Sequence, residues 1–291
     1  MRLAALVLGY RAPQVLAAAL PVLERAGFDV FLHVDAKADL GAYLRALGPA
    51  GAVCQVTSDR VGVFWGGFSM MRAELALLQA AYRRQRYDRL VLLSDDCFPL
   101  LGPVALRRFM TDDIERISLR RLEAGDPFLA RYQGFYCFDH EALTLLPRPI
   151  EASALDTDAV DLIAGAAALM KRGKKPIPIF YASQWWALTG VAADRVLEVW
   201  RSDAWLVDSF RYAAVPDEIM ISTIIGNFAA DRPVCNSPVL VDWSREPRPY
   251  VFAGPTEAAA IAEPHHAFAR KLRADAGPDL LAWQARLLAA G

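Results

Sequence analysis

The first 110 residues alternate between short apolar runs and amphipathic helical patterns, and this alternation restricts the folds open to the chain. Apolar runs of strand length recur, and leucine, valine and methionine at helical spacing fill the intervals between them. Strands that alternate with helices in this way predict a parallel sheet with helices on its faces. The expected strands are 3–8, 30–34, 52–56 and 90–93, and the expected helices are 13–26, 40–47 and 68–84.

Length and charge exclude several other classes of protein. The 291 residues include 32 basic and 33 acidic side chains, and a chain of this length buries a full core without disulfides or a structural metal. The near-neutral charge argues against a protein that holds nucleic acid mainly by bulk electrostatics. The four cysteines are widely spaced, which favours buried thiols in a reducing compartment. Without a long apolar run or a signal-peptide core, the sequence predicts a cytoplasmic protein, with the inner face of a membrane as the alternative place.

Three aspartates follow expected strands, at the edge of the sheet where ligands bind in such folds. Asp35 follows the strand 30–34, and Asp95 and Asp96 follow the strand 90–93. A buried carboxylate needs a cation or a hydrogen-bond donor to compensate for the loss of water. Asp95 and Asp96 therefore either contact a nucleotide sugar or a metal, or they cap a helix. Asp35 either binds a ribose hydroxyl or a base amide, or it closes a turn.

Tryptophans mark two further segments of interest. Trp65 precedes two glycines and the helix 68–84, so its indole offers a flat face for a base or a sugar beside a closely approaching backbone. A tight turn with a core tryptophan would leave the same pattern. Trp185 and Trp186 are adjacent, and in an extended segment they point to opposite faces. We expect one of them in the core and the other exposed to a sugar ring.

Charged residues of the last third include one candidate base and one cationic group. Glu218 follows Pro216 and Asp217 at the start of a helix expected to run to Ile225, a position where acids are also common for structural reasons. A group of basic residues in the tail grips a diphosphate by charge-assisted bonds or is ordinary surface charge. Its members are Arg245, Arg248, Arg270, Lys271 and Arg273.

Taken in chain order, these segments share their motifs with one enzyme family. The motifs are His33-Val-Asp35-x-Lys37, Val63-Phe-Trp-Gly-Gly-Phe-Ser69, Leu92-Leu-Ser-Asp-Asp-Cys-Phe-Pro99, Ser183-Gln-Trp-Trp186, Pro216-Asp-Glu218, Asp242-Trp-Ser244 and His266-Ala-Phe-Ala-Arg-Lys271. The chain thereby resembles glycosyltransferase family 14, the core-2/I-branching β-1,6-N-acetylglucosaminyltransferases and peptide O-xylosyltransferases. Two positions depart from the family pattern: Cys97 replaces an aspartate and Ala182 replaces a glycine.

The resemblance implies an α/β fold of GT-A type, a Rossmann-like αβα sandwich with a mainly parallel sheet. Residues 1–291 would form a single glycosyltransferase domain, with 1–110 as the nucleotide-binding half and 111–291 as the acceptor-binding and catalytic half. It also implies an inverting enzyme that moves a sugar from a UDP-sugar to a glycan, glycolipid or peptide hydroxyl with a β linkage. N-acetylglucosamine is the favoured sugar and xylose the next.

Family positions also assign roles to individual residues. By resemblance Glu218 is the general base, and Arg248 and Lys271 stabilise the leaving UDP. The residues expected to bind the nucleotide are Asp35, Trp65, Asp95 and Asp96, together with these two cations. The residues expected to bind the sugars are Gln184, Trp186 and Trp243.

Two other readings stay open. The family implies no required metal, but a metal-dependent transferase would use Asp95 and Asp96 to hold Mn²⁺ or Mg²⁺ through their carboxylate oxygens. A catalytically inactive nucleotide- or glycan-binding module is the second alternative, although the acid at Glu218 and both cations are retained. We expect no nucleic-acid partner and no transmembrane segment, with peripheral membrane contact left open.

Overall fold

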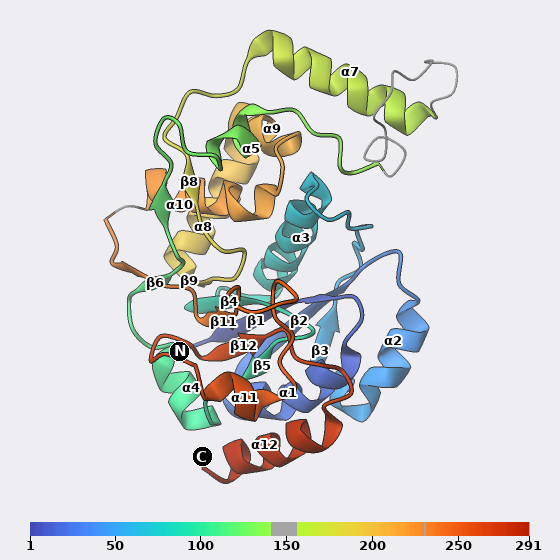
Figure 1. The fold of residues 1–291 in the computed structure, drawn as a ribbon, viewed down its shortest axis with the longest axis vertical. Helices are drawn as coiled ribbons and strands as arrows, with labels where there is room; N and C mark the ends of the chain where they lie inside the picture. The colour runs from blue at the N-terminus through green and yellow to red at the C-terminus, as the bar shows by residue number, and fades with distance from the viewer. Residues whose placement is uncertain (141–155, 230, 291) are drawn as a thin grey trace.

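A computed structural model describes residues 1–140, 156–229 and 231–290, and its centre is a seven-stranded sheet with helices around it (Figure 1). The strand order is β10-β6-β9-β4-β1-β2-β3. The strands β1 to β4 run parallel, β9 is antiparallel to both β4 and β6, and β10 is parallel to β6. The expected α/β class with a mainly parallel sheet is therefore confirmed. The strands are β1 (Leu3–Gly9), β2 (Phe28–Val34), β3 (Cys54–Val56), β4 (Arg89–Ser94), β6 (Glu115–Arg116), β9 (Ala187–Thr189) and β10 (Val234–Cys235).

Helices connect the parallel strands as the alternating pattern predicts. The helix α1 (Pro13–Arg25) joins β1 to β2, α2 (Leu40–Leu47) precedes β3, and α3 (Phe68–Arg84) leads to β4. Gly27 follows α1 with a φ of 86°, a conformation that glycine adopts without steric cost. The strand β3 is shorter than expected because a 3-10 helix, η1 (Gly48–Val53), occupies its first residues.

The second half of the chain completes the sheet and adds a helical layer. Its helices are α4 (Pro103–Phe109), α5 (Leu129–Gln133), α7 (Thr157–Arg172), α8 (Gly190–Ser202), α9 (Ala204–Arg211), η3 (Pro216–Glu218) and α10 (Met220–Phe228). The single helix expected from Pro216 to Ile225 is thus divided into η3 and α10. The backbone carbonyl of Glu218 accepts a hydrogen bond from the N–H of Ala182, on a neighbouring segment, and the ladder of α10 begins after it.

A smaller sheet brings the tail of the chain back against β4 and α1. It has the order β11-β12-β5, with β5 (Phe98–Pro99), β11 (Val239–Val241) and β12 (Phe268–Arg270). A two-stranded pair, β7 (Arg120–Arg121) and β8 (Phe180–Tyr181), lies in the second half. The helix α11 (Pro255–Ala259) lies between β11 and β12 in the chain, and α12 (Gly277–Ala289) follows β12. Because β12 pairs with β5, the tail residues after β12 lie close to the carboxyl end of β4. Among the described residues, no helix combines the length and apolarity needed to cross a membrane.

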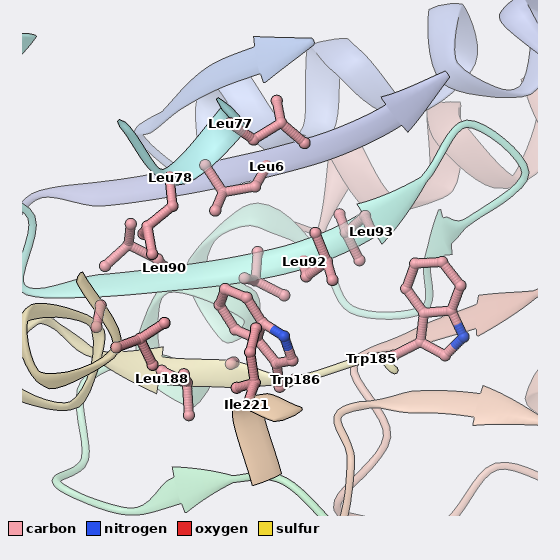
Figure 2. Close-up of a cluster of buried hydrophobic side chains, with 14 of the residues drawn as sticks. Leu6, Leu77, Leu78, Leu90, Leu92, Leu93, Trp185, Trp186, Leu188 and Ile221 are labelled. Atoms are coloured by element: carbon pink, nitrogen blue, oxygen red, sulfur yellow. The ribbon is translucent and has the colours of Figure 1, made fainter. Parts of the chain in front are cut away.

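Both tryptophans before β9 are buried, so the expectation that one of them is exposed to a sugar is wrong. Trp185 is 4% and Trp186 is 2% exposed. Figure 2 shows the Trp186 ring between Leu92 on β4 and Ile221 on α10, within the main core. The cause is the position of β9 inside the sheet, since the carbonyl of Trp186 accepts a hydrogen bond from the N–H of Leu92. Trp186 therefore stabilises the core and is not a sugar-binding residue.

Candidate active site

Two groups of charged side chains lie around the segment that leads into β9. We define the acid cluster as Glu74, Asp217 and Glu218, and the cation cluster as Arg11, Arg270 and Lys271. The acid cluster comes from α3 and η3. In the cation cluster, Arg270 and Lys271 lie beside Asp96 just after β4, and Arg11 lies near Lys271.

The turn that carries Glu218 has a strained backbone. Val215, directly before η3, has a φ of 52°, which is unfavourable for a β-branched residue. Such a conformation costs on the order of 1–3 kcal/mol and persists only where the surroundings hold it in place. One such contact is the hydrogen bond from the Val215 N–H to the carbonyl of Gly66, at 2.9 Å. The start of α3 therefore fixes the turn that presents Glu218.

Glu218 is largely buried and is held by an arginine that the sequence does not single out. Its Oε2 accepts a hydrogen bond from Nη1 of Arg131 on α5 at 2.8 Å, and 21% of its side chain is exposed. Burial raises the pKa of Glu218, while Arg131 and the hydroxyl of Tyr181 lower it, and the net shift is upward. A partly exposed carboxylate with a raised pKa is suited to accept a proton near neutral pH.

Two further acids lie beside Glu218 in an unusual state. Asp217 and Glu74 are both buried, and in the described part of the chain Oδ1 of Asp217 and Oε2 of Glu74 have no hydrogen-bond partner. Burial and the neighbouring Glu218 raise the pKa of Asp217 to about 7. Burial, reinforced by Asp217, raises the pKa of Glu74 well above its ordinary value. The sequence gives one signal for Glu74: it is an acid on a helix face that otherwise carries Met71 and Leu75.

Gln184, a predicted sugar-binding residue, contacts the acid cluster. Its Nε2 donates a hydrogen bond to Oε1 of Glu74 at 2.8 Å. The amide nitrogen is thus used inside the protein, and the predicted contact of Gln184 with sugar is left to its remaining atoms.

The cation cluster is built around Asp96. Nε of Arg270 lies 3.3 Å from Oδ1 of Asp96, and the Arg270 guanidinium lies over the Trp185 ring at 4.2 Å. Burial acts to raise the pKa of Asp96, but Arg270, Ser94 and Lys271 outweigh it and the net shift is downward. The pKa of Lys271 is lowered by burial and by the neighbouring Arg270. The structure therefore places Asp96, Arg270 and Lys271 together, and their predicted contact with the nucleotide stays a prediction.

Asp95 has a different environment from its neighbour. Its Oδ2 accepts hydrogen bonds from the backbone N–H groups of Tyr10, Arg11 and Ala12 at 2.7, 2.9 and 2.9 Å, and from the Tyr43 hydroxyl at 3.0 Å. The three backbone donors belong to the loop between β1 and α1, and Tyr43 belongs to α2, so Asp95 fastens this loop to the end of β4. The helix α1 has no side-chain cap, so the helix-capping alternative is not what the structure shows. Burial is the main cause of its raised pKa, which the backbone donors partly offset.

Asp35 lies at the end of β2 and organises a loop. Its carboxylate accepts hydrogen bonds from the backbone N–H of Lys37 at 2.8 Å and from Lys37 Nζ at 2.9 Å. The guanidinium of Arg60 donates to the carbonyls of Val34, Asp35 and Ala38 in the same loop. The turn reading of Asp35 is thus present in the structure, and the nucleotide reading stays a prediction.

Three predicted binding residues lie at the surface. Trp65 is 80% and Trp243 is 58% exposed, so both indoles have faces open to solvent. Arg248 is also exposed, and its Nε lies 3.0 Å from Oε1 of Glu246. The described contacts of Arg248 do not include the cation cluster, although its loop approaches it: the N–H of Phe252 donates to the carbonyl of Lys271 at 2.8 Å.

One short segment connects the two clusters. The N–H of Ala182 donates to the carbonyl of Glu218, and three residues later the Trp185 ring lies beneath Arg270. Three residues of extended chain span at most ~10 Å. The residues immediately before β9 therefore connect a partly exposed carboxylate to a group of cations, a pairing that suits proton removal beside a developing negative charge.

Comparison with known proteins assigns the family. The family model described as "Branch: Core-2/I-Branching enzyme" matches residues 12–262, which is most of the chain. Among solved structures, a galactosyltransferase LgtC crystallised with donor and acceptor sugar analogues is 10% identical, with 98% of this chain and 96% of that chain covered and a TM-score of 0.47. No curated protein matches the sequence. The chain belongs to the Core-2/I-Branching enzyme family, and it is a glycosyltransferase.

Proposed function

We propose that the protein is an inverting glycosyltransferase that uses a UDP-sugar donor and forms a β linkage to a hydroxyl acceptor. N-acetylglucosamine is the first candidate sugar, xylose is the second, and a glycan, glycolipid or peptide supplies the acceptor. The family supports the reaction class. The observation that carries the mechanism is the position of Glu218, a carboxylate with a raised pKa that the segment 182–185 links to the cation cluster.

In this mechanism Glu218 is the general base. Inverting transfer requires a base that takes the proton of the acceptor hydroxyl while that oxygen attacks the anomeric carbon. Arg131 holds the carboxylate in one orientation and favours its charged form. The proton passes from the acceptor to a carboxylate oxygen of Glu218, and the bond to UDP breaks on the opposite side of the sugar.

The leaving UDP is stabilised by side-chain cations. Negative charge grows on the diphosphate as the bond breaks, and fixed positive charges near it lower the barrier. Lys271 and Arg270 are already grouped beside Asp96, and we assign the clamp to Lys271, Arg270 and Arg248. To act in this clamp, the Arg248 guanidinium must leave the Glu246 carboxylate and bind a phosphate oxygen.

The remaining predicted residues divide into contacts and supports. Asp35 and Trp65 bind the nucleotide, and Trp243 offers its exposed indole to a sugar. Asp95 and Asp96 support the donor site indirectly, Asp95 through the loop before α1 and Asp96 through Arg270. The residues 1–110 thus contribute nucleotide contacts, and 111–291 contribute the base and the clamp.

A metal held by Asp95 and Asp96 fits this arrangement poorly. One oxygen of Asp95 already accepts four hydrogen bonds, and Asp96 is paired with Arg270. A divalent cation at Asp96 would also face the positive charges of Arg270 and Lys271. We therefore propose that transfer requires no metal.

The test is binding of UDP-GlcNAc, UDP-xylose, UDP-glucose and GDP-mannose by calorimetry, each with EDTA and with Mn²⁺, followed by transfer assays with the donor that binds. We expect one UDP-sugar to bind in EDTA. Binding only with Mn²⁺ would contradict metal independence. Absence of binding to all four would contradict the donor assignment and favour an inactive module.

A further inference from the structure

The loop that follows β11 is closed at both of its ends. We define this arginine loop as residues 243–249. Directly after it, the N–H of Tyr250 donates a hydrogen bond to the carbonyl of Asp242 at 2.8 Å. Two residues later, the N–H of Phe252 donates to the carbonyl of Lys271, also at 2.8 Å. The arginine loop therefore leaves the smaller sheet and returns to it beside a member of the cation cluster.

Arg245, which the sequence offers as a cation for a diphosphate, is bonded to two acids of the protein itself. Its Nε donates to Oδ2 of Asp242 at 2.6 Å, and its Nη1 donates to Oε1 of Glu257 on α11 at 2.7 Å. The guanidinium also lies 3.7 Å from the centre of the Tyr250 ring. Asp242 is buried, so one end of this bridge is fixed in the interior. Arg245 thereby joins the start of the arginine loop to α11.

Glu257 connects both ends of the same loop. Besides Arg245, its Oε1 accepts a hydrogen bond from the Tyr250 hydroxyl at 3.1 Å, and its Oε2 accepts one from the N–H of Ala253 at 2.8 Å. Arg245 lies near the start of the loop, whereas Tyr250 and Ala253 follow its end. Hydrogen bonds to an ionised carboxylate are about twice as strong as neutral ones. One carboxylate on α11 therefore fastens the two sides of the loop to each other.

Two residues that the proposed function gives to the substrate extend outward from this loop. Trp243 is largely exposed, and the Arg248 side chain is 58% exposed with its Nε 3.0 Å from Oε1 of Glu246. Arg248 lies between Pro247 and Pro249, whose rings fix the backbone angle φ. Because the backbone at the tip is restricted in this way, the direction in which Arg248 extends depends on how the two sides of the loop are held.

From these contacts we propose that Glu257 and Arg245 are positioning residues of the donor site, which hold the arginine loop so that Arg248 reaches the diphosphate. The proposal rests on the proposed function for the role of Arg248 in the clamp. It gives Arg245 a task other than direct contact with phosphate. Since a positioning residue acts through another residue, its loss should weaken UDP binding only while Arg248 is present.

The first experiment is a double-mutant cycle on UDP affinity, measured by calorimetry. We expect Arg248→Ala to lower the affinity roughly 10- to 150-fold, as for the loss of a charged donor. Glu257→Ala alone should lower it about 3- to 30-fold, and in the Arg248→Ala background by no more than about twofold. The matched control is Glu263→Ala, which alters an exposed acid beside His265 and should keep wild-type affinity. Equal losses from Glu257→Ala in both backgrounds, or no loss in either, overturn the positioning role.

The second experiment separates the bridge from the charge of Arg245. Arg245→Lys keeps the charge but lacks the planar group that spans two carboxylates and stacks on an aromatic ring. We therefore expect Arg245→Lys and Arg245→Met to lose UDP affinity equally, within about twofold. Wild-type affinity in Arg245→Lys, together with a loss in Arg245→Met, would show that the charge alone matters and would overturn the bridge.

The third experiment follows the loop without any substrate, by hydrogen–deuterium exchange of the segment 243–253. The amides of Ser244 and Ala253 are bonded to the carboxylates of Asp242 and Glu257. We expect the segment to exchange faster in Glu257→Ala than in the wild type and in Glu263→Ala. Equal exchange in all three proteins overturns the tie. Faster exchange in Glu257→Ala, in a protein whose wild type binds no UDP, contradicts the proposed function and leaves the tie established.

Discussion

The acid cluster and the cation cluster treat charge in opposite ways. In the cation cluster Arg270 faces Asp96 and the pKa of Asp96 is lowered, so unlike charges balance each other. In the acid cluster three carboxyl groups lie together, one arginine reaches Glu218, and two buried oxygens have no partner among the described residues. A balanced group binds a ligand by exchanging partners, whereas a crowded group of like charges holds protons. The comparison agrees with the proposed roles, in which the cation cluster binds the diphosphate and Glu218 accepts the proton.

The largest effect should come from removing the base. Glu218→Gln keeps the size of the side chain but accepts no proton, so we expect a loss of roughly 10²- to 10⁴-fold in kcat with UDP binding retained. Steady-state kinetics and calorimetry measure the two quantities on one preparation. Normal transfer by this variant would mean that Glu218 is not the base.

A smaller effect should follow from weakening the clamp. Lys271→Ala removes a charged hydrogen-bond donor worth about 1.5–3 kcal/mol, so we expect UDP affinity and kcat/KM each to fall by roughly 10- to 150-fold. The effect extends to binding because the diphosphate is charged before the reaction as well as during it. Arg273→Ala is the control, since Arg273 is exposed and paired with Asp275. Equal losses in both variants would point to a general effect of charge and contradict a local clamp.

The arginine on the base should set the acidic side of the pH profile. Arg131 lowers the pKa of Glu218, so Arg131→Met should raise that pKa and move the acidic limb of kcat/KM to higher pH. Arg120→Met alters a neighbour that pairs with Asp126 and should leave the limb in place. Identical pH profiles for wild type and Arg131→Met would show that Arg131 does not influence the pKa of the base.

The last prediction concerns stability. The pKa of Asp217 rises from 3.8 to about 7 on folding, so between these values the native state binds more protons than the unfolded state. The contribution of Asp217 to the free energy of unfolding therefore falls as pH rises from about 4 to 7, and is constant above that. Urea unfolding of the wild type and of Asp217→Asn across this range should show a flatter dependence in the variant. Parallel curves for the two proteins would show that the pKa of Asp217 is not raised in the native state.

Local sequence patterns predict the strands and helices of the first half of the chain. They predict the candidate site only in part. The apolar run Leu90 to Leu93 predicts the strand β4, and the spacing of apolar residues in 68–84 predicts the helix α3. The backbone donors to Asp95 come from residues about 85 positions earlier, so no local pattern reveals that it holds the loop before α1. Arg131 lies in a region of mixed periodicity, and only the folded chain brings it to Glu218.

The burial of Trp186 shows where motif reasoning fails. The adjacent tryptophans predict alternating faces, but both rings enter the interior, Trp186 beside Ile221 of α10 and Trp185 beneath Arg270. Which face of a strand meets solvent depends on the layers that pack on it, and those layers come from distant parts of the chain.

The carboxylate of Asp95, bonded to the loop before α1, has a consequence for salt dependence. Three successive backbone N–H groups in the loop before α1 could otherwise bind a phosphate, but here an internal anion already occupies them. The attraction for a diphosphate then depends on mobile side chains instead of fixed backbone dipoles. Partly exposed charges are screened by dissolved ions, so we expect UDP to dissociate faster as ionic strength increases. A residue that fastens one loop thereby makes donor retention sensitive to the surrounding medium.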